Sequence, residues 1–127
     1  MQKLTGETLA AIGRMTVAAT ELEYVLAWIG ADRADGDATA VFSQPGEPLR
    51  AARGSVEFAS PAYRDEYIHA VEGAGTQLAR SQAALRAMWR DGGRTDAATF
   101  DEIAVFLLRC RDALHRMLRA ELSEPAG

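Results

Sequence analysis

Residues 102–118 read EIAVFLLRCRDALHRML, and this stretch decides the fold because its apolar residues recur every three or four positions. Such steps place side chains on one face of an α-helix. That face is formed by Phe100, Ile103, Leu107, Cys110, Leu114 and Met117. Four further apolar positions widen it, namely Val105, Phe106, Leu108 and Leu118. An apolar face this wide is typical of a buried helix or of a homodimer interface.

A second long helix precedes this one and is predicted to end at the sequence WRDGG, residues 89–93. Ser60 is a favourable N-cap and Pro61 a favourable first helical residue, so the helix is predicted to begin there. Its apolar face is formed by Tyr63, Tyr67, Val71, Ala74, Leu78, Leu85 and Met88. About six residues separate the two helices, and so short a connection requires them to be antiparallel neighbours.

The N-terminal half supplies the remaining helices. A first long helix is predicted from about Thr5 to Gly30, with an apolar face formed by Leu9, Ile12, Ala19, Leu22, Leu26 and Ile29. The sequence GADRADGDAT at residues 30–39 interrupts it, because glycine and aspartate favour loops. Pro48 then suits the first turn of a short helix. We therefore predict an all-α, four-helix bundle with one short irregular helix, formed by residues 1–127 as a single domain.

Composition and charge limit the classes of function. The net charge is −4, so bulk charge does not attract nucleic acid, and any such site would be a local cluster of arginines. Cys110 is the only cysteine, which favours a reducing compartment. The N-terminal sequence has no signal-peptide pattern, and no apolar run reaches membrane-spanning length. We expect a cytoplasmic protein that does not contact a membrane.

Three stretches carry a resemblance to the HEPN-like helical proteins, particularly small actinobacterial members. They are ATELEYVLAWI at 19–29, FSQPGEPLRAAR at 42–53 and LARSQAALRAMWRDGG at 78–93. With the final helix, the likeness covers most of the chain. The resemblance implies a HEPN-like bundle that forms a homodimer, in a toxin–antitoxin or phage-defence setting. Active members of the family cleave RNA without metal, in a composite site across the dimer.

The family's nuclease motif pairs an arginine with a histidine four to six residues later, and this chain departs from it. Arg80 matches the arginine, but Ser81 replaces the usual acidic or amide residue. Arg86 stands where the histidine is expected, and an arginine cannot transfer a proton at usable pH. Trp89 matches a trailing aromatic residue. The resemblance implies a degenerate site that binds phosphate or RNA through Arg80, Ser81, Arg86 and Trp89. The alternative is a solvated arginine face beside a buried Trp89.

A literal match to the motif lies earlier, in RDEYIH at residues 64–69. Arg64 could hold a phosphate and His69 could move a proton near neutral pH, so they are the candidate catalytic pair. On an ideal helix they lie about 140° apart, so they share a substrate only if the arginine curls round the helix. The alternative is a surface histidine near Glu66 and Glu72.

Two acid–histidine pairs, Glu66–His69 and Asp112–His115, have the spacing of ligands in di-iron helical bundles. Such sites also need glutamates from two further helices, and Glu21 or Glu23 of the first helix could supply one of them. However, His69 is predicted to point away from the core, so we expect no metal or other cofactor.

The leading hypothesis is therefore a binding or interaction module with a degenerate nuclease site, a homodimer whose partner is a protein or RNA. The first alternative is an active metal-independent ribonuclease. The second alternative is a metal-binding four-helix bundle.

Overall fold

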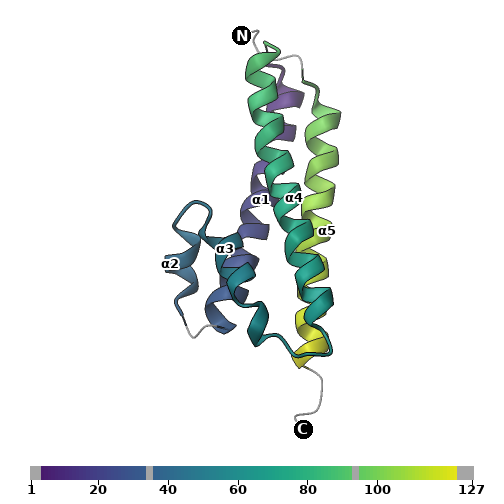
Figure 1. Ribbon diagram of the computed structural model, residues 1–127. Helices are drawn as coiled ribbons and strands as arrows, with labels where there is room; N and C mark the ends of the chain where they lie inside the picture. Colours follow the sequence, from purple (N-terminus) through teal and green to yellow (C-terminus); the bar gives the residue numbers. More distant parts are fainter. Residues whose placement is uncertain (1–3, 34–35, 93–94, 123–127) are drawn as a thin grey trace.

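The computed structural model describes residues 4–33, 36–92 and 95–122, and within these ranges it contains helices and no strands (Figure 1). The three long helices are α1 (Gly6–Arg33), α4 (Arg64–Arg90) and α5 (Ala97–Leu122). Two short helices, α2 (Ala38–Phe42) and α3 (Glu47–Gly54), and a 3₁₀ turn, η1 (Val56–Phe58), connect α1 to α4. Helices account for 84% of the described residues, which confirms the predicted all-α bundle. No helix in these ranges is both long and apolar enough to cross a membrane.

The long helices lie side by side, and α5 packs against both of the others (Figure 1). Arg14 pairs with Asp101 at 2.8 Å, and Glu21 pairs with Arg111 further along, so α1 and α5 run parallel. The α4 helix runs antiparallel to α5, as the short connection predicts (Figure 1). Asp96 begins α5 as an N-cap, because its carboxylate accepts the backbone N–H of Thr99 at 3.0 Å.

Packing on two sides explains the wide apolar face of α5. Six of its apolar side chains are buried in the core, namely Phe100, Ile103, Ala104, Leu107, Leu114 and Met117. Three more are half-buried against that core, namely Leu108, Cys110 and Leu118, and Phe106 is half-buried beside Arg80 and Arg109. Among the described large apolar side chains of α5, Val105 is the one that stays exposed, at 47%. The width of this face therefore arises within a single chain and is not by itself evidence for a dimer.

The short helix α3 completes the bundle by crossing α1 in close contact. A Cβ atom added at Gly30 would lie 2.7 Å from the carbonyl carbon of Ala51 and 2.8 Å from the backbone nitrogen of Ala52. Only a glycine therefore allows this separation of the two backbones. Before α3, Gly46 has a φ of 82°, a conformation that suits glycine, and Pro48 lies in the first turn as predicted.

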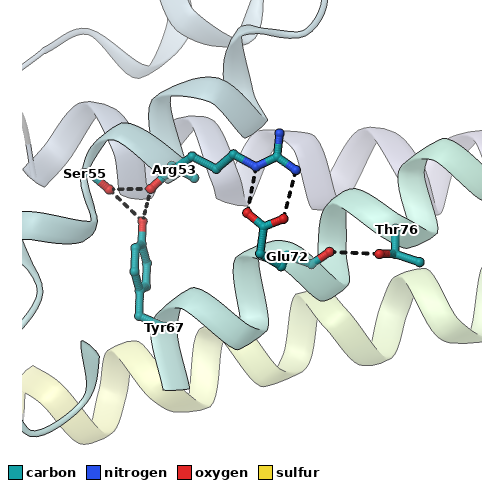
Figure 2. Close-up of polar contacts among 6 residues, drawn as sticks. Arg53, Ser55, Tyr67, Glu72 and Thr76 are labelled. Carbon is teal, nitrogen blue, oxygen red and sulfur yellow. Dashed lines mark hydrogen bonds and ion pairs between the residues drawn. The ribbon is translucent and has the colours of Figure 1, made fainter. Parts of the chain in front are cut away.

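Polar contacts join α3 to α4 (Figure 2). The buried Tyr67 hydroxyl donates to the carbonyl oxygen of Ala52 at 2.8 Å, and the Ser55 hydroxyl lies 2.6 Å from it. Arg53 binds the Glu72 carboxylate through two nitrogens, at 2.8 and 3.0 Å, and this hydrogen bonding lowers the pKa of Glu72. The pair is exposed and contributes little to stability, whereas the buried hydroxyls fix the end of α3.

The predicted start of α4 was wrong, because the helix begins at Arg64 and not at Ser60 and Pro61. The carbonyl oxygen of Ser60 accepts the N–H of Tyr63 at 2.9 Å, so these residues form a turn ahead of the helix. The Arg64 guanidinium donates to the carbonyl oxygens of Glu57 at 3.4 Å and Ala59 at 3.2 Å. These bonds hold the η1 turn against the first residue of α4.

The α1 helix has two apolar faces, one of which lies outside the core. The core face is formed by Ala11, Met15, Ala18, Leu22, Leu26 and Ile29, which are all buried. Leu9 was predicted on this face but is 54% exposed, because it lies about 140° from Leu22 around an ideal helix. Val17, Tyr24 and Trp28 also point away from the core and remain exposed.

Candidate functional site

An open groove of about 1090 Å³ lies between α1 and α5, with Phe42 of α2 also lining it. The α1 wall presents Val17, Tyr24 and Trp28, which are 58%, 50% and 42% exposed. Their spacing of seven and four residues places them on one face of α1. The Tyr24 ring meets the Phe42 ring edge-on, with centroids 5.4 Å apart. Large apolar side chains gathered in one solvent-open groove mark a binding surface.

The α5 wall of the same groove is polar and carries charges of both signs. It presents Arg111, Asp112, His115 and Arg119. Arg111 lies between two carboxylates, since it bonds Asp112 at 3.0 Å and also pairs with Glu21 of α1. These hydrogen bonds, that of Asp112 foremost, raise the pKa of Arg111. The groove therefore offers an apolar strip beside a row of fixed charges, which suits an amphipathic partner.

The predicted catalytic pair does not meet in one cleft. His69 lines a second cleft of about 610 Å³ between α4 and α5, together with Asp65, Glu66 and Arg116, whereas Arg64 is not among its lining residues. The Arg64 guanidinium is held by the two carbonyl oxygens before α4, and its Nε atom is buried with no hydrogen-bond partner among the described residues. The arginine thus supports the chain turn, and the geometry does not favour joint action with His69.

Arg80 and Ser81 both point toward the body of the bundle. Arg80 donates to Glu102 at 3.4 Å, and its guanidinium carbon lies 5.5 Å from the centroid of the Phe106 ring. Ser81 is only 4% exposed, and its hydroxyl donates to the carbonyl oxygen of Leu78 at 2.7 Å. A ligand cannot reach this hydroxyl, so Ser81 drops out of the candidate phosphate-binding residues.

Arg86 and Trp89 face solvent near the end of α4. Trp89 is 67% exposed, so the expectation of a buried Trp89 beside the arginines was wrong. Around an ideal helix Trp89 lies about 60° from Arg86 and about 180° from Arg80. Arg86 and Trp89 therefore lie on neighbouring parts of the exposed face of α4, whereas Arg80 faces Glu102 and Ser81 is buried, so the structure does not bring the four residues together into one site.

Metal ligands are not gathered in the described part of the chain. His69 and His115 line different clefts, on opposite sides of α5. No three His, Cys, Asp or Glu side chains within residues 4–33, 36–92 and 95–122 are grouped as a metal site would require.

The Cys110 thiol is half-buried, and this burial raises its pKa, which disfavours the nucleophilic thiolate.

The residues that define the groove were missed by sequence reasoning. Tyr24 and Trp28 lie in ATELEYVLAWI and were included only as part of the stretch that carries the family resemblance. The sequence did contain a signal for them, because Tyr24 and Trp28, like Val17, lie outside the helix face that contains Leu22 and Leu26. A second apolar face on a helix whose first face already covers a core indicates a further contact.

Comparison with known proteins adds no assignment to this geometry. No family model, curated protein or solved structure matches the chain. The chemistry of the α1–α5 groove is therefore the basis for a functional conclusion, and the HEPN-like character stays a resemblance.

Proposed function

We propose that the protein is an interaction module that seats an amphipathic helix in the α1–α5 groove. The observation that carries this proposal is the exposure of Val17, Tyr24 and Trp28 in one open groove. Helix-in-groove recognition uses apolar anchors spaced by three, four and seven residues on one helix face. A helix lying there would cover the apolar strip of α1 and turn its polar flank toward Arg111 and His115 of α5.

The placement of the nuclease candidates supports binding rather than catalysis. Arg86 occupies the place of the proton-transferring histidine and stays charged at every usable pH. Arg64 is bound to backbone carbonyls, and His69 has no arginine of the motif beside it in its cleft. An active ribonuclease would need both an anion-holding and a proton-transferring group at the same phosphate.

The HEPN resemblance gives this proposal a biological setting. In that setting the chain is a HEPN-like bundle with a degenerate nuclease site, and it acts in the cytoplasm within a toxin–antitoxin or phage-defence system. Its partner is then a protein, with RNA as the alternative that the family suggests. The support is the likeness of residues 19–29, 42–53 and 78–93 and the single cysteine.

The groove should bind the apolar fluorescent dye ANS at protein concentrations where light scattering shows a monomer. We expect Trp28→Glu to abolish most of the fluorescence increase, because it puts a charge in the apolar wall in place of an aromatic ring. Trp89→Glu is the matched control, since Trp89 is exposed but does not line the groove, and it should leave the signal unchanged. Background fluorescence with the unmodified protein would refute the proposed binding surface.

Purified protein should not cleave total RNA in the presence of EDTA. The physical reason is that Arg64, Arg80 and His69 point to different places, and Arg86 cannot accept a proton. Arg86→His alone should not create a nuclease, because Arg80 faces Glu102 of α5. The assay is gel analysis of RNA beside His69→Ala and Arg80→Ala variants. Metal-free cleavage that disappears with His69→Ala would establish the ribonuclease alternative instead.

A further inference from the structure

The outer face of α1 carries a second helical seam that the bundle leaves uncovered. Residues at alternating steps of three and four along this face are Ala10, Gly13, Val17, Thr20, Tyr24 and Trp28, and every one of them is exposed. Steps of this kind are the spacing at which one helix packs along another. The core face of α1 lies on the other side of the helix, so this seam is free for a contact outside the chain.

Side-chain size changes along the seam in one direction. The N-terminal half is narrow, because its residues are Gly6, Ala10 and Gly13. The space around the two glycines is open, since a Cβ added at either would meet nothing within 4 Å. The C-terminal half is broad, with Tyr24 and Trp28 standing out from the helix. Two such seams fit together when one is reversed, because the broad half of each then faces the narrow half of the other. In that arrangement Trp28 faces Gly6, and Val17 lies at the centre.

Charged residues lie beside the seam at intervals of about seven residues, and their signs alternate along it. On the side toward α5, Glu7, Arg14 and Glu21 follow one another seven residues apart. Arg119 of α5, which lines the groove with Trp28, supplies the fourth charge. The order is negative, positive, negative, positive. A reversed second copy places Arg14 against Glu21 and Glu7 against Arg119, twice over.

We propose that the helix seated in the groove is α1 of a second copy of this chain, packed antiparallel about a two-fold axis near Val17. This inference rests on the proposed function and names its partner. A two-fold interface requires a surface that complements itself, and the reversal of both size and charge along α1 meets that requirement. Val105 of α5 is exposed, and the ion pairs of Arg14 and Glu21 place it at the height of Val17 along the bundle.

Light scattering coupled to size exclusion tests the dimer. The unmodified chain should show twice its 13.7 kDa mass at high concentration and dissociate on dilution. Trp28→Glu should weaken the dimer at least about tenfold, as loss of an aromatic anchor at an interface does, with an unchanged circular dichroism spectrum. Trp89→Glu is the control and should remain dimeric. A monomer at every concentration, or equal weakening by both variants, would overturn the inference.

A charge exchange tests the direction of packing. Glu21→Arg alone places two arginines against each other in each half of the interface and should produce a monomer. Adding Arg14→Glu restores opposite charges across the interface and should restore the dimer. Within one chain the same double variant sets a glutamate beside Asp101 and an arginine beside Arg111, so a purely internal role predicts further loss instead. Failure of the double variant to dimerise would contradict the antiparallel arrangement.

Cysteine crosslinking gives an independent measure of the axis. In a Cys110→Ser background, Val17→Cys should form a disulfide with its own copy, because position 17 faces itself across the axis. Tyr24→Cys should not, because it faces Ala10 of the other copy, and crosslinking of both variants would instead indicate parallel helices. If the chain is monomeric but ANS still requires Trp28, the self-association fails while the proposed helix-binding function stands. Loss of both signals rejects both proposals.

Discussion

Tyr67→Ala is expected to lower the free energy of unfolding by about 3–5 kcal/mol, the range for removing a buried aromatic ring. The Tyr67 side chain is fully buried in the core, and its hydroxyl lies within 2.8 Å of both the Ala52 carbonyl oxygen and the Ser55 hydroxyl. The substitution removes the ring and also one of the polar contacts that join α3 to α4 (Figure 2). A single domain is stable by about 5–15 kcal/mol, so the variant should be close to unfolding. Urea denaturation followed by circular dichroism measures the change.

Tyr67→Phe separates the ring from the hydroxyl. Ser55 keeps its own hydrogen bond to the Ala52 carbonyl oxygen, at 2.9 Å, so no buried acceptor is abandoned. The expected loss is therefore only about 1 kcal/mol, the net worth of one hydrogen bond. Equal losses for the two variants would show that the hydroxyl, and not the ring, holds α3 in place.

Gly30→Ala should lower the free energy of unfolding by about 2 kcal/mol, even though alanine favours helix by about 1 kcal/mol over glycine. The added methyl group would lie 2.7–2.8 Å from main-chain atoms of Ala51 and Ala52, which cannot move without shifting α3. Because Gly30 is two residues from Trp28, the same shift should also disturb the groove and reduce ANS binding. Denaturant midpoints and dye fluorescence of one preparation give both results.

Gly73→Ala is the matched control for this substitution. Gly73 lies inside α4, and a Cβ there would meet nothing within 4 Å. Only the helix-propensity term applies, so the variant should be more stable by up to about 1 kcal/mol. A stabilising Gly30→Ala would mean that α1 and α3 are further apart than the structure places them.

The outer face of α1 is the feature with the clearest functional meaning. Val17, Tyr24 and Trp28 could be replaced by polar residues without a cavity in the core, since the core face is formed by Leu22, Leu26 and their neighbours. Aromatic side chains in such exposed positions contribute to binding more than to folding. On α1 the residues that face the core therefore serve folding, and the residues that face the groove are available for binding.

The candidate sites show that the spacing of a motif predicts positions along a helix but not access to a ligand. Spacing predicted that Arg64 and His69, or Arg80 and Arg86, lie on nearby turns of a helix, and both pairs do lie on α4. Spacing does not say which direction is open to a ligand. Arg64 is bound to the preceding turn and Arg80 faces α5, because neighbouring chain segments offer them oxygen atoms and an aromatic ring.

The sequence by itself determined the long helices and the antiparallel pairing of α4 and α5, because helical periodicity depends on residues within a few positions of one another and a short connection leaves one arrangement. Only the tertiary structure decided which apolar face each helix buries. The wide face of α5 is used inside the chain because α1 and α4 lie on its two sides. Trp28 and Trp89 stay exposed, and Ser81 is buried, because burial depends on which segment packs against a residue, and that segment is distant in the sequence.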